Sequence, residues 1–331
     1  MLRERRGEPL PSRSPQGAGT IEDMERKSAG AASRALHRFA LLTAGTTFLL
    51  IIAGGLVVGF EAGLAVPDWP LSFGTWMPPM VGGVFYEHGH RMIAGTVGVL
   101  TTVLAVWLAW RDPRPWLKGV GIAAWAAVVV QAILGGLTVL YLLPIPILIA
   151  HAGLAQVFFC LVLSLALFTS PAWEHASQAQ EPIPTGFPSL AATATAALFF
   201  QLLLGAALRH NALGVMPHVM GAVVASCLVG LVCYQAITGF SERDALRKAA
   251  RWVGGILALQ LVLGVLSYFS RLATPSAVFS QTTVVIVTTA HVATGALLLG
   301  GNLILTLLAR RRMADSGRQG SLAGSPQRTL A

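Results

Sequence analysis

Residues 148–168 read LIAHAGLAQVFFCLVLSLALF, a run without a single Asp, Glu, Lys or Arg. A helix that crosses the hydrocarbon core of a bilayer needs about 20 consecutive, mostly apolar residues. The run has that length, and its main polar interruptions are His151, Gln156 and Ser164. It therefore predicts a transmembrane helix that carries one ionisable side chain near one end.

Seven other stretches share this character, so the chain is predicted to cross a membrane eight times. We expect spans at 37–60, 90–110, 118–141, 148–170, 188–208, 217–239, 252–270 and 284–309. Of the 331 residues, 54% are hydrophobic and 11% are charged, whereas a soluble domain has about 25% charged residues. This composition excludes a water-soluble globular enzyme, a disordered chain and a nucleic-acid-binding protein. It predicts an all-α polytopic membrane protein with eight transmembrane helices in membrane lipid.

The distribution of Lys and Arg predicts the orientation of these spans, because cytoplasmic loops are rich in both residues. With eight crossings, the two tails and the loops at 111–118, 171–187 and 240–251 lie on one side. With the N-terminal tail counted through Arg38, these segments contain twenty Lys and Arg residues, and the other side has three, Arg91, Arg209 and Arg271. Both termini are therefore expected in the cytoplasm. Short loops and the lack of a transit-type leader favour a bacterial plasma membrane.

The order of the spans divides the chain into two halves of four. We expect a disordered cytoplasmic tail at 1–36, a first half at 37–170, a linker at 171–187, a second half at 188–309 and a cytoplasmic tail at 310–331. The pattern Q-x-x-L-G recurs at Gln131–Gly135, Gln201–Gly205 and Gln260–Gly264, with a degenerate copy at Leu50–Gly54. Because these copies lie on spans 1, 3, 5 and 7, the sequence predicts two pseudo-symmetric four-helix bundles. Glycine and glutamine inside membrane helices usually serve helix packing.

Each even-numbered span carries one histidine near its outer end: His90, His151, His218 and His291. Ionisable side chains inside a membrane are rare and are functional by default. Imidazoles on facing helices of a bundle can bind a metal ion or the two axial positions of a haem iron. We therefore predict two pairs, His90 with His151 and His218 with His291. We place His88 in a loop or at the rim, because two residues apart on a helix it would point away from His90.

The two halves differ on their outer side. The first has a long loop at 61–89, rich in Pro, Gly and Trp, which we expect to fold as a lid over the mouth of the bundle. Its counterpart at 209–216 is short. Glu87 precedes His90 by three residues and so shares its helical face, but no carboxylate precedes His218. A carboxylate beside one site only favours a reaction site paired with an electron-transfer site, although a glutamate at a helix N-terminus is also favoured by the helix dipole.

The element Glu87-His-Gly-His90-Arg91, the loop Gly63-Leu-Ala-Val-Pro-Asp68-Trp69-Pro70 and the four histidines resemble the haem A synthase family over about 37–309. The resemblance implies an enzyme that oxidises the C8 methyl of haem O to a formyl group through hydroxylated intermediates, for cytochrome oxidase assembly. It further implies that His90 and His151 flank the substrate haem, that His218 and His291 ligate haem b, and that Glu87 is the essential carboxylate.

The sequence allows more than one role for Arg91 and more than one function for the chain. Arg91 pairs with a haem propionate or reaches the membrane interface. The loop cysteines of many family members are missing at 61–87, so Pro, Trp and packing are expected to hold the lid. The alternative function is a non-catalytic carrier of electrons with two b haems. Contact with haem O synthase and the formation of a homo-oligomer are left open.

Overall fold

The computed structural model describes residues 21–176, 183–241, 244–273 and 278–323. Apart from a single β-bridge between Ser72 and Thr75, its regular structure is helical. The helices are α1 (Ile21–Gly59), α2 (Gly83–Arg111), α3 (Pro115–Leu140), α4 (Ile145–Phe168), α5 (Pro171–Ala176), α6 (Phe187–Arg209), α7 (Val215–Gly239), α8 (Ala245–Tyr268), the π-helical turn η1 (Phe269–Ala273) and α9 (Gln281–Ala323).

Eight of these helices are long and apolar enough to cross a membrane, as the sequence predicts. In lipid a helix is stable because it satisfies its own backbone hydrogen bonds. Large apolar side chains face outward along the spans, including Trp110, Trp252 and Phe200, as a lipid-facing surface requires. The chain is therefore an all-helical, multi-pass membrane protein.

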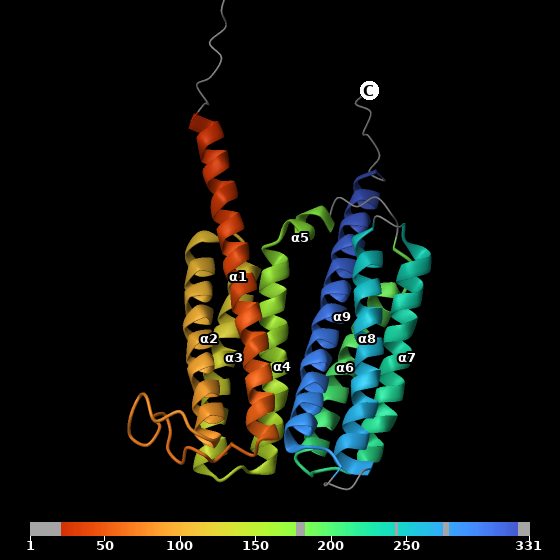
Figure 1. Ribbon diagram of the computed structural model, residues 1–331. Coiled ribbons are helices and arrows are strands. Elements are labelled where there is room, and N and C mark those ends of the chain that lie inside the picture. The colour runs from red at the N-terminus through yellow and green to blue at the C-terminus, as the bar shows by residue number, and fades with distance from the viewer. Residues whose placement is uncertain (1–20, 177–182, 242–243, 274–277, 324–331) are drawn as a thin grey trace, which may run out of the picture.

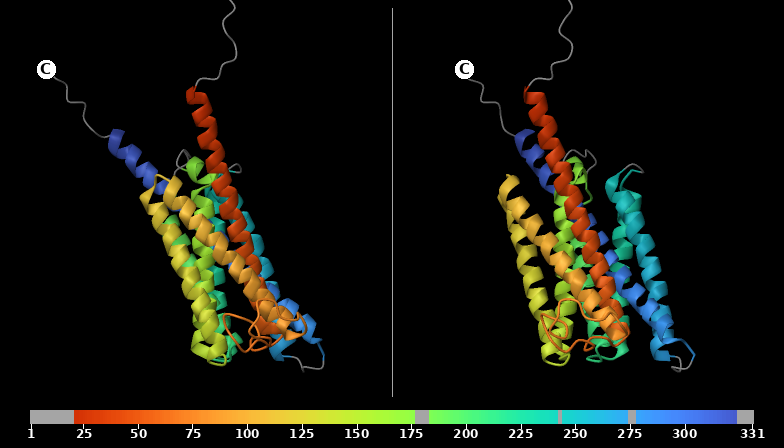
Figure 2. Two further views of the ribbon diagram at one scale, coloured as in Figure 1. Left: turned by 90° about the vertical axis from the view of Figure 1, so that its left-hand side faces the viewer. Right: turned by 60° about the vertical axis from the view of Figure 1, so that its left-hand side comes forward.

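The spans form two groups of four with the same contact pattern. In the N-terminal group, α1 contacts α2, α2 contacts α3, α3 contacts α4, and α4 returns to α1. In the C-terminal group, α6, α7, α8 and α9 contact each other in the same cyclic order. Figure 1 shows the two groups side by side, and Figure 2 shows their helices roughly parallel. This pattern is consistent with the predicted duplication.

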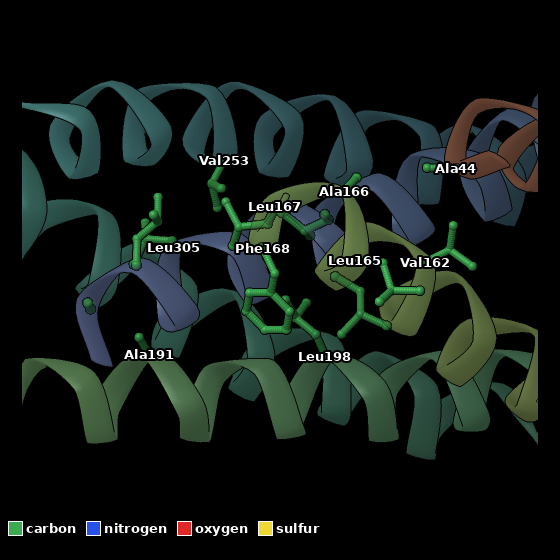
Figure 3. Packing of buried hydrophobic residues seen from close by; sticks show 14 of the residues in the cluster. Ala44, Val162, Leu165, Ala166, Leu167, Phe168, Ala191, Leu198, Val253 and Leu305 are labelled. Atoms are coloured by element: carbon green, nitrogen blue, oxygen red, sulfur yellow. The ribbon is translucent and has the colours of Figure 1, made fainter. Parts of the chain in front are cut away.

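Helix α9 occupies the centre of the molecule. It contacts α1 and α4 of the N-terminal group as well as α6 and α8. In the most apolar stretch of α9, 67% of the residues are buried, whereas 6% are buried in the corresponding stretch of α8. Figure 3 shows the shared core, where Leu165 and Phe168 of α4 lie near Leu198 of α6 and Leu305 of α9.

Two glycines of α1 allow a close approach between the groups. Gly55 faces Thr289 of α9 and Gly59 faces Val285, and at both positions a β-carbon would collide with the opposing side chain. Glycines four residues apart lie on one helix face and let two membrane helices pack closely. The pair therefore fixes the spacing between α1 and α9.

Several helix ends differ from the predicted boundaries. Helix α1 begins at Ile21, inside the segment 1–36 that we expected to be disordered, and α9 runs to Ala323, inside the predicted tail 310–331. Part of the linker 171–187 is the short helix α5, and residues 177–182 lie outside the described ranges. Helix α2 begins at Gly83, so the outer loop is 60–82 and not 61–89; we call residues 60–82 the lid loop. Ile21 and Ala323 lie at the end of the molecule opposite the lid loop (Figure 1).

A buried ion pair fixes α9 to the start of α8 at the end away from the lid loop. Asp244 caps α8 by accepting a hydrogen bond from the Leu246 N–H at 2.6 Å. Its two carboxylate oxygens also accept from Arg312 at 2.7 and 3.0 Å, and both side chains are 5% exposed. Such a bidentate pair aligns the two helices firmly.

Asp244→Asn is expected to destabilise the protein by about 3–5 kcal/mol, because it removes the charge of a carboxylate that pairs with the buried Arg312 cation. Asparagine is also a good N-cap, so the substitution removes mainly the charge. Thermal unfolding in detergent micelles, followed by circular dichroism, measures the effect. The double variant Asp244→Asn with Arg312→Gln is expected to recover part of the loss, and a single variant as stable as the wild type would contradict the prediction.

Candidate functional site

The four histidines of the even-numbered spans occupy equivalent positions in the structure. Each ring lies against the glycine of the Q-x-x-L-G repeat on the preceding helix of its group, in a notch that only glycine leaves open. A β-carbon at the glycine would stand 3.0–3.3 Å from the Cε1 atom of the ring, in the pairs Gly54–His90, Gly135–His151, Gly205–His218 and Gly264–His291. Each of these glycines therefore leaves room for an imidazole ring, in addition to allowing close helix packing. We call such a glycine the seat of the ring.

The first residue of each repeat also faces a ring. In all four copies the backbone of this residue lies close to one imidazole ring. The pairs are Leu50 with His90, Gln131 with His151, Gln201 with His218 and Gln260 with His291. The Nδ1 atoms of His90, His151 and His291 are buried without a well-aligned hydrogen bond. When Nδ1 donates its proton to a backbone carbonyl, Nε2 keeps its lone pair for a metal ion. The repeat thus places each ring beside a backbone group, and a hydrogen bond from Nδ1 to such a group would leave Nε2 for ligation.

Two glutamines hold the backbone of the histidines. Gln131 Nε2 donates to the carbonyl of His151 at 2.9 Å. Gln201 Nε2 donates to the carbonyl of His218 at 2.8 Å and lies 3.0 Å from its Nδ1. Each glutamine therefore joins two helices and fixes the position of a histidine.

The structure brings together both predicted pairs of histidines. The ring centres of His218 and His291 are 6.3 Å apart, with the ring planes at 82°. His90 and His151 are close enough for a charge on one ring to act on the other. All four histidines are half-buried near the lid-loop end of their helices.

The distance between His218 and His291 fits one metal ion held by two imidazoles. A nitrogen ligand binds a metal at about 2 Å and the ring centre lies about 1 Å behind it, so two rings on one ion have centres about 6 Å apart. Within the described ranges, no cluster of three or more His, Cys, Asp or Glu side chains could hold a metal ion. The C-terminal group therefore offers a pair of imidazoles, the donor set of a six-coordinate haem iron.

Glu87 lies in the first part of α2 and is only 4% exposed. Its Oε2 accepts a hydrogen bond from the N–H of Val66 in the lid loop at 2.7 Å. Its Oε1 accepts from Arg91 at 2.6 Å. Because both partners are donors, the arrangement suits an ionised carboxylate. Glu87 therefore joins the lid loop to the helix that carries His90.

Arg91 is the main anchor of the lid loop. It donates to the carbonyls of Asp68 at 2.7 Å, Leu71 at 2.8 Å and Val66 at 3.2 Å, in addition to Glu87. The guanidinium, 16% exposed, is thus surrounded by loop backbone. From the sequence, Arg91 could contact a haem propionate or reach the membrane interface. In the structure it contacts the lid loop and Glu87.

Asp68 and Trp69 also determine the shape of the lid loop. Asp68 accepts hydrogen bonds from the N–H groups of Phe73 and Gly74 at 2.7 and 2.8 Å. The Gly74 N–H, together with that of Phe73, holds the pKa of Asp68 below its usual value. The ring of Trp69 stands over Gly136 of α3, where a β-carbon would be only 2.7 Å from it. The loop therefore extends from α2 to α3, and polar contacts hold it as well as the expected Pro, Trp and packing.

The prediction for His88 was wrong. His88 lies on α2 because the helix begins at Gly83, and it is 6% exposed. Its Nδ1 lies 2.8 Å from the Ser72 hydroxyl of the lid loop. Hydropathy missed this helical turn because Glu87 and His88 are polar, and the contacts that satisfy them come from a loop.

Sequence reasoning also missed Arg209, which it placed simply in an outer loop. Arg209 ends α6, and its NH2 group donates to the carbonyl of Gly55 in α1 at 2.8 Å. The contact joins the two groups of helices across 154 positions of sequence. A lone arginine at the outer end of an apolar span was the one available signal.

An apolar pocket lies between α4 and α6, where the two groups meet. It is lined by Ile149, Gly153, Leu154, Phe199, Leu203 and their neighbours. None of the predicted site residues lines it, so the histidine sites are separate from this pocket.

Fold and site together define an all-helical, multi-pass membrane protein with a facing pair of histidines in each of two four-helix groups. The family COX15-CtaA, described as cytochrome oxidase assembly protein, matches residues 81–219. These residues run from the start of α2 to just beyond His218. The match therefore includes Glu87, His90, Arg91, His151 and His218.

Relatives extend the similarity beyond this region. A haem A synthase of Symbiobacterium thermophilum is 26% identical over 262 residues, which cover 70% of this chain and 85% of that protein. A haem A synthase of Bacillus pumilus is 24% identical over 273 residues, covering 72% and 87%. One of Roseobacter denitrificans is 38% identical over 130 residues, about a third of each chain (35% and 34%). The chain is therefore similar to haem A synthases over most of its length, in agreement with the resemblance of its sequence.

Proposed function

We propose that the chain is a haem A synthase that oxidises the C8 methyl of haem O to a formyl group through hydroxylated intermediates. The observation that carries the proposal is the difference between two otherwise equivalent histidine pairs. Beside His90 a buried carboxylate is tied to a folded loop, whereas no carboxylate precedes His218. One pair is then equipped for chemistry and the other for electron transfer.

His218 and His291 would hold haem b in the C-terminal group. The 6.3 Å between their ring centres would suit two imidazoles that share one iron. Haem b, when bound there, supplies a one-electron redox centre. Gly205 and Gly264 seat the two rings, and Gln201 holds the backbone of His218. This chain's own contribution is therefore the fixed orientation of both ligands.

His90 and His151 would flank the substrate, haem O, in the N-terminal group. The lid loop reaches from α2, through Arg91, to α3, through the contact of Trp69 with Gly136. In this position it would exclude water from the substrate. A site that excludes water strengthens each electrostatic interaction inside it.

Glu87 would accept a proton from the reacting group or stabilise positive charge on the oxidised methyl. Its oxygens accept hydrogen bonds from Val66 and Arg91, and both bonds would weaken when the carboxylate takes a proton and loses its charge. Glu87 would therefore couple the chemistry to the position of the lid loop.

A second function, a non-catalytic carrier of electrons with two b haems, is favoured by the equivalence of the four glycine notches. The two functions are separated in cells that lack their own haem A synthase but contain haem O synthase. When the chain is expressed, haem A is expected in the extracted haems if it is an enzyme. Haem b with unchanged haem O would contradict the proposal and support the carrier.

Gly264→Val tests the seat of the haem b ligand. The new side chain would displace the His291 ring, because a β-carbon alone would already stand 3.1 Å from Cε1. We expect haem b affinity to fall about tenfold or more, as when a group that orients a ligand is lost. Haem titration followed by visible absorbance measures it. Gly255→Val is the matched control on the same helix, since Gly255 has open space around it; an equal effect of both substitutions would contradict the prediction.

A further inference from the structure

Arg209 and Arg271 form a positive cluster at the lid-loop end of the C-terminal group. Arg209 is the last residue of α6, and Arg271 lies in the π-helical turn η1. Arg271 NH2 donates to the carbonyl of Arg209 at 3.3 Å. His210 follows directly, and its burial, with the charges of Arg209 and Arg271, lowers its pKa. His210 is therefore neutral at pH 7, and the two guanidinium groups carry the charge.

No carboxylate of this half of the chain balances the cluster. The sequence has no Asp or Glu between Glu181 and Glu242, or between Asp244 and Asp315. Asp244 precedes α8, at the opposite end of the helices. Among the described residues, the hydrogen bond given by the Arg209 side chain goes to a neutral carbonyl, that of Gly55, and its Nε atom is buried without a partner. A buried cation without a counter-ion destabilises the folded protein, so an anion bound beside Arg209 would stabilise it.

The cluster lies beside the paired rings. Arg209 is close enough to His291 for its charge to act on that ring. Its NH2 group contacts Gly55, the neighbour of Gly54, which seats His90. A carboxylate attached to a ligand of His218 and His291 could therefore reach the unpartnered Nε atom of Arg209. Arginine is suited to this contact because its planar fork binds a carboxylate through two hydrogen bonds.

We propose that Arg209 binds a propionate carboxylate of the porphyrin held by His218 and His291, with Arg271 adding a second positive charge. This inference rests on the proposed function, because it requires a porphyrin in the C-terminal group. The anion is the porphyrin's own and not a lipid phosphate, since the unpartnered Nε is buried inside the protein. Arg209 is thus a positioning residue for the cofactor and also the hydrogen-bond link to α1.

The test compares haem b with its dimethyl ester, which has the same iron and ring but no carboxylates. Full-length protein from haem-deficient cells is titrated in neutral detergent, and binding is followed by the absorbance of the bis-imidazole complex. We expect the wild type to prefer the diacid by about ten- to a hundredfold, the range of a charge-assisted contact. Arg209→Gln is expected to bind both porphyrins with similar affinity, and Arg209→Lys to retain part of the preference.

Arg111→Gln is the control, because it removes an exposed arginine at the other end of the helices; it is expected to keep the full preference. The proposal is overturned if the wild type binds diacid and diester equally, or if Arg209→Gln keeps the wild-type preference. It is also overturned if phosphatidylglycerol added to the micelles removes the preference in the wild type, which would assign the cluster to a lipid headgroup. If neither porphyrin gives the bis-imidazole spectrum, the proposed haem b site itself fails, and that outcome differs visibly from the others.

Discussion

Glu87→Gln is expected to lower haem A formation by about a hundredfold or more, the usual contribution of a residue that takes up a proton. The substitution keeps the size of the side chain but removes the charge that pairs with Arg91. The proposed haem b site in the other group of helices does not involve Glu87, so haem b content is expected to stay at the wild-type level. Extracted haems, separated by chromatography, give both quantities from one sample.

Glu61→Gln is the matched control for this experiment. Glu61 lies in the same lid loop but is exposed, and we expect its substitution to leave haem A formation unchanged. Normal haem A output from Glu87→Gln would contradict the role assigned to Glu87. A parallel loss of haem b would instead indicate that Glu87 is needed only for folding.

His218→Ala and His291→Ala are each expected to remove haem b from the C-terminal group. Loss of a residue that merely orients a metal ligand costs about 10–100-fold in affinity, so loss of the ligand itself is expected to exceed a hundredfold. The six-coordinate absorbance bands should disappear together with the bound haem. Because the second imidazole alone leaves one axial position open, a low-spin spectrum is not expected from either variant.

His210→Ala provides the control for the histidine substitutions. His210 lies at the same end of the molecule but directly follows α6, outside the paired positions. It is expected to keep the wild-type spectrum. Unchanged haem b in His218→Ala would contradict the pairing of His218 with His291.

The eight spans and the four histidines could be predicted because both depend on local composition. A bilayer imposes a length of about 20 apolar residues, and a histidine inside such a run is easily noticed. The seats of the rings could not be predicted with the same ease. Gly135 and Gly264 have the usual appearance of packing residues, and their contact with His151 and His291 appears only when two helices are placed together.

The lid loop and the outer arginines show a different limit. The role of Arg91 depends on three backbone carbonyls whose directions follow from the folded loop. The contact between Arg209 and Gly55 joins residues far apart in sequence. The periodicity of the sequence does not predict such contacts. Each contact depends on how segments far apart in the sequence pack together, and the hydropathy of each segment alone gives no sign of it. The start of α2 was missed for a related reason, since loop contacts compensate the polar side chains of its first turns.

The central position of α9 has a consequence for biosynthesis. The ribosome completes α9 after α1, α4, α6 and α8, yet all four of these helices pack against it. The helices that are inserted earlier therefore stay in the bilayer with incomplete contact surfaces until α9 follows, because chains generally acquire their structure in the order of synthesis. His291 belongs to α9, so its proposed pair with His218 can form only after α9 has been made.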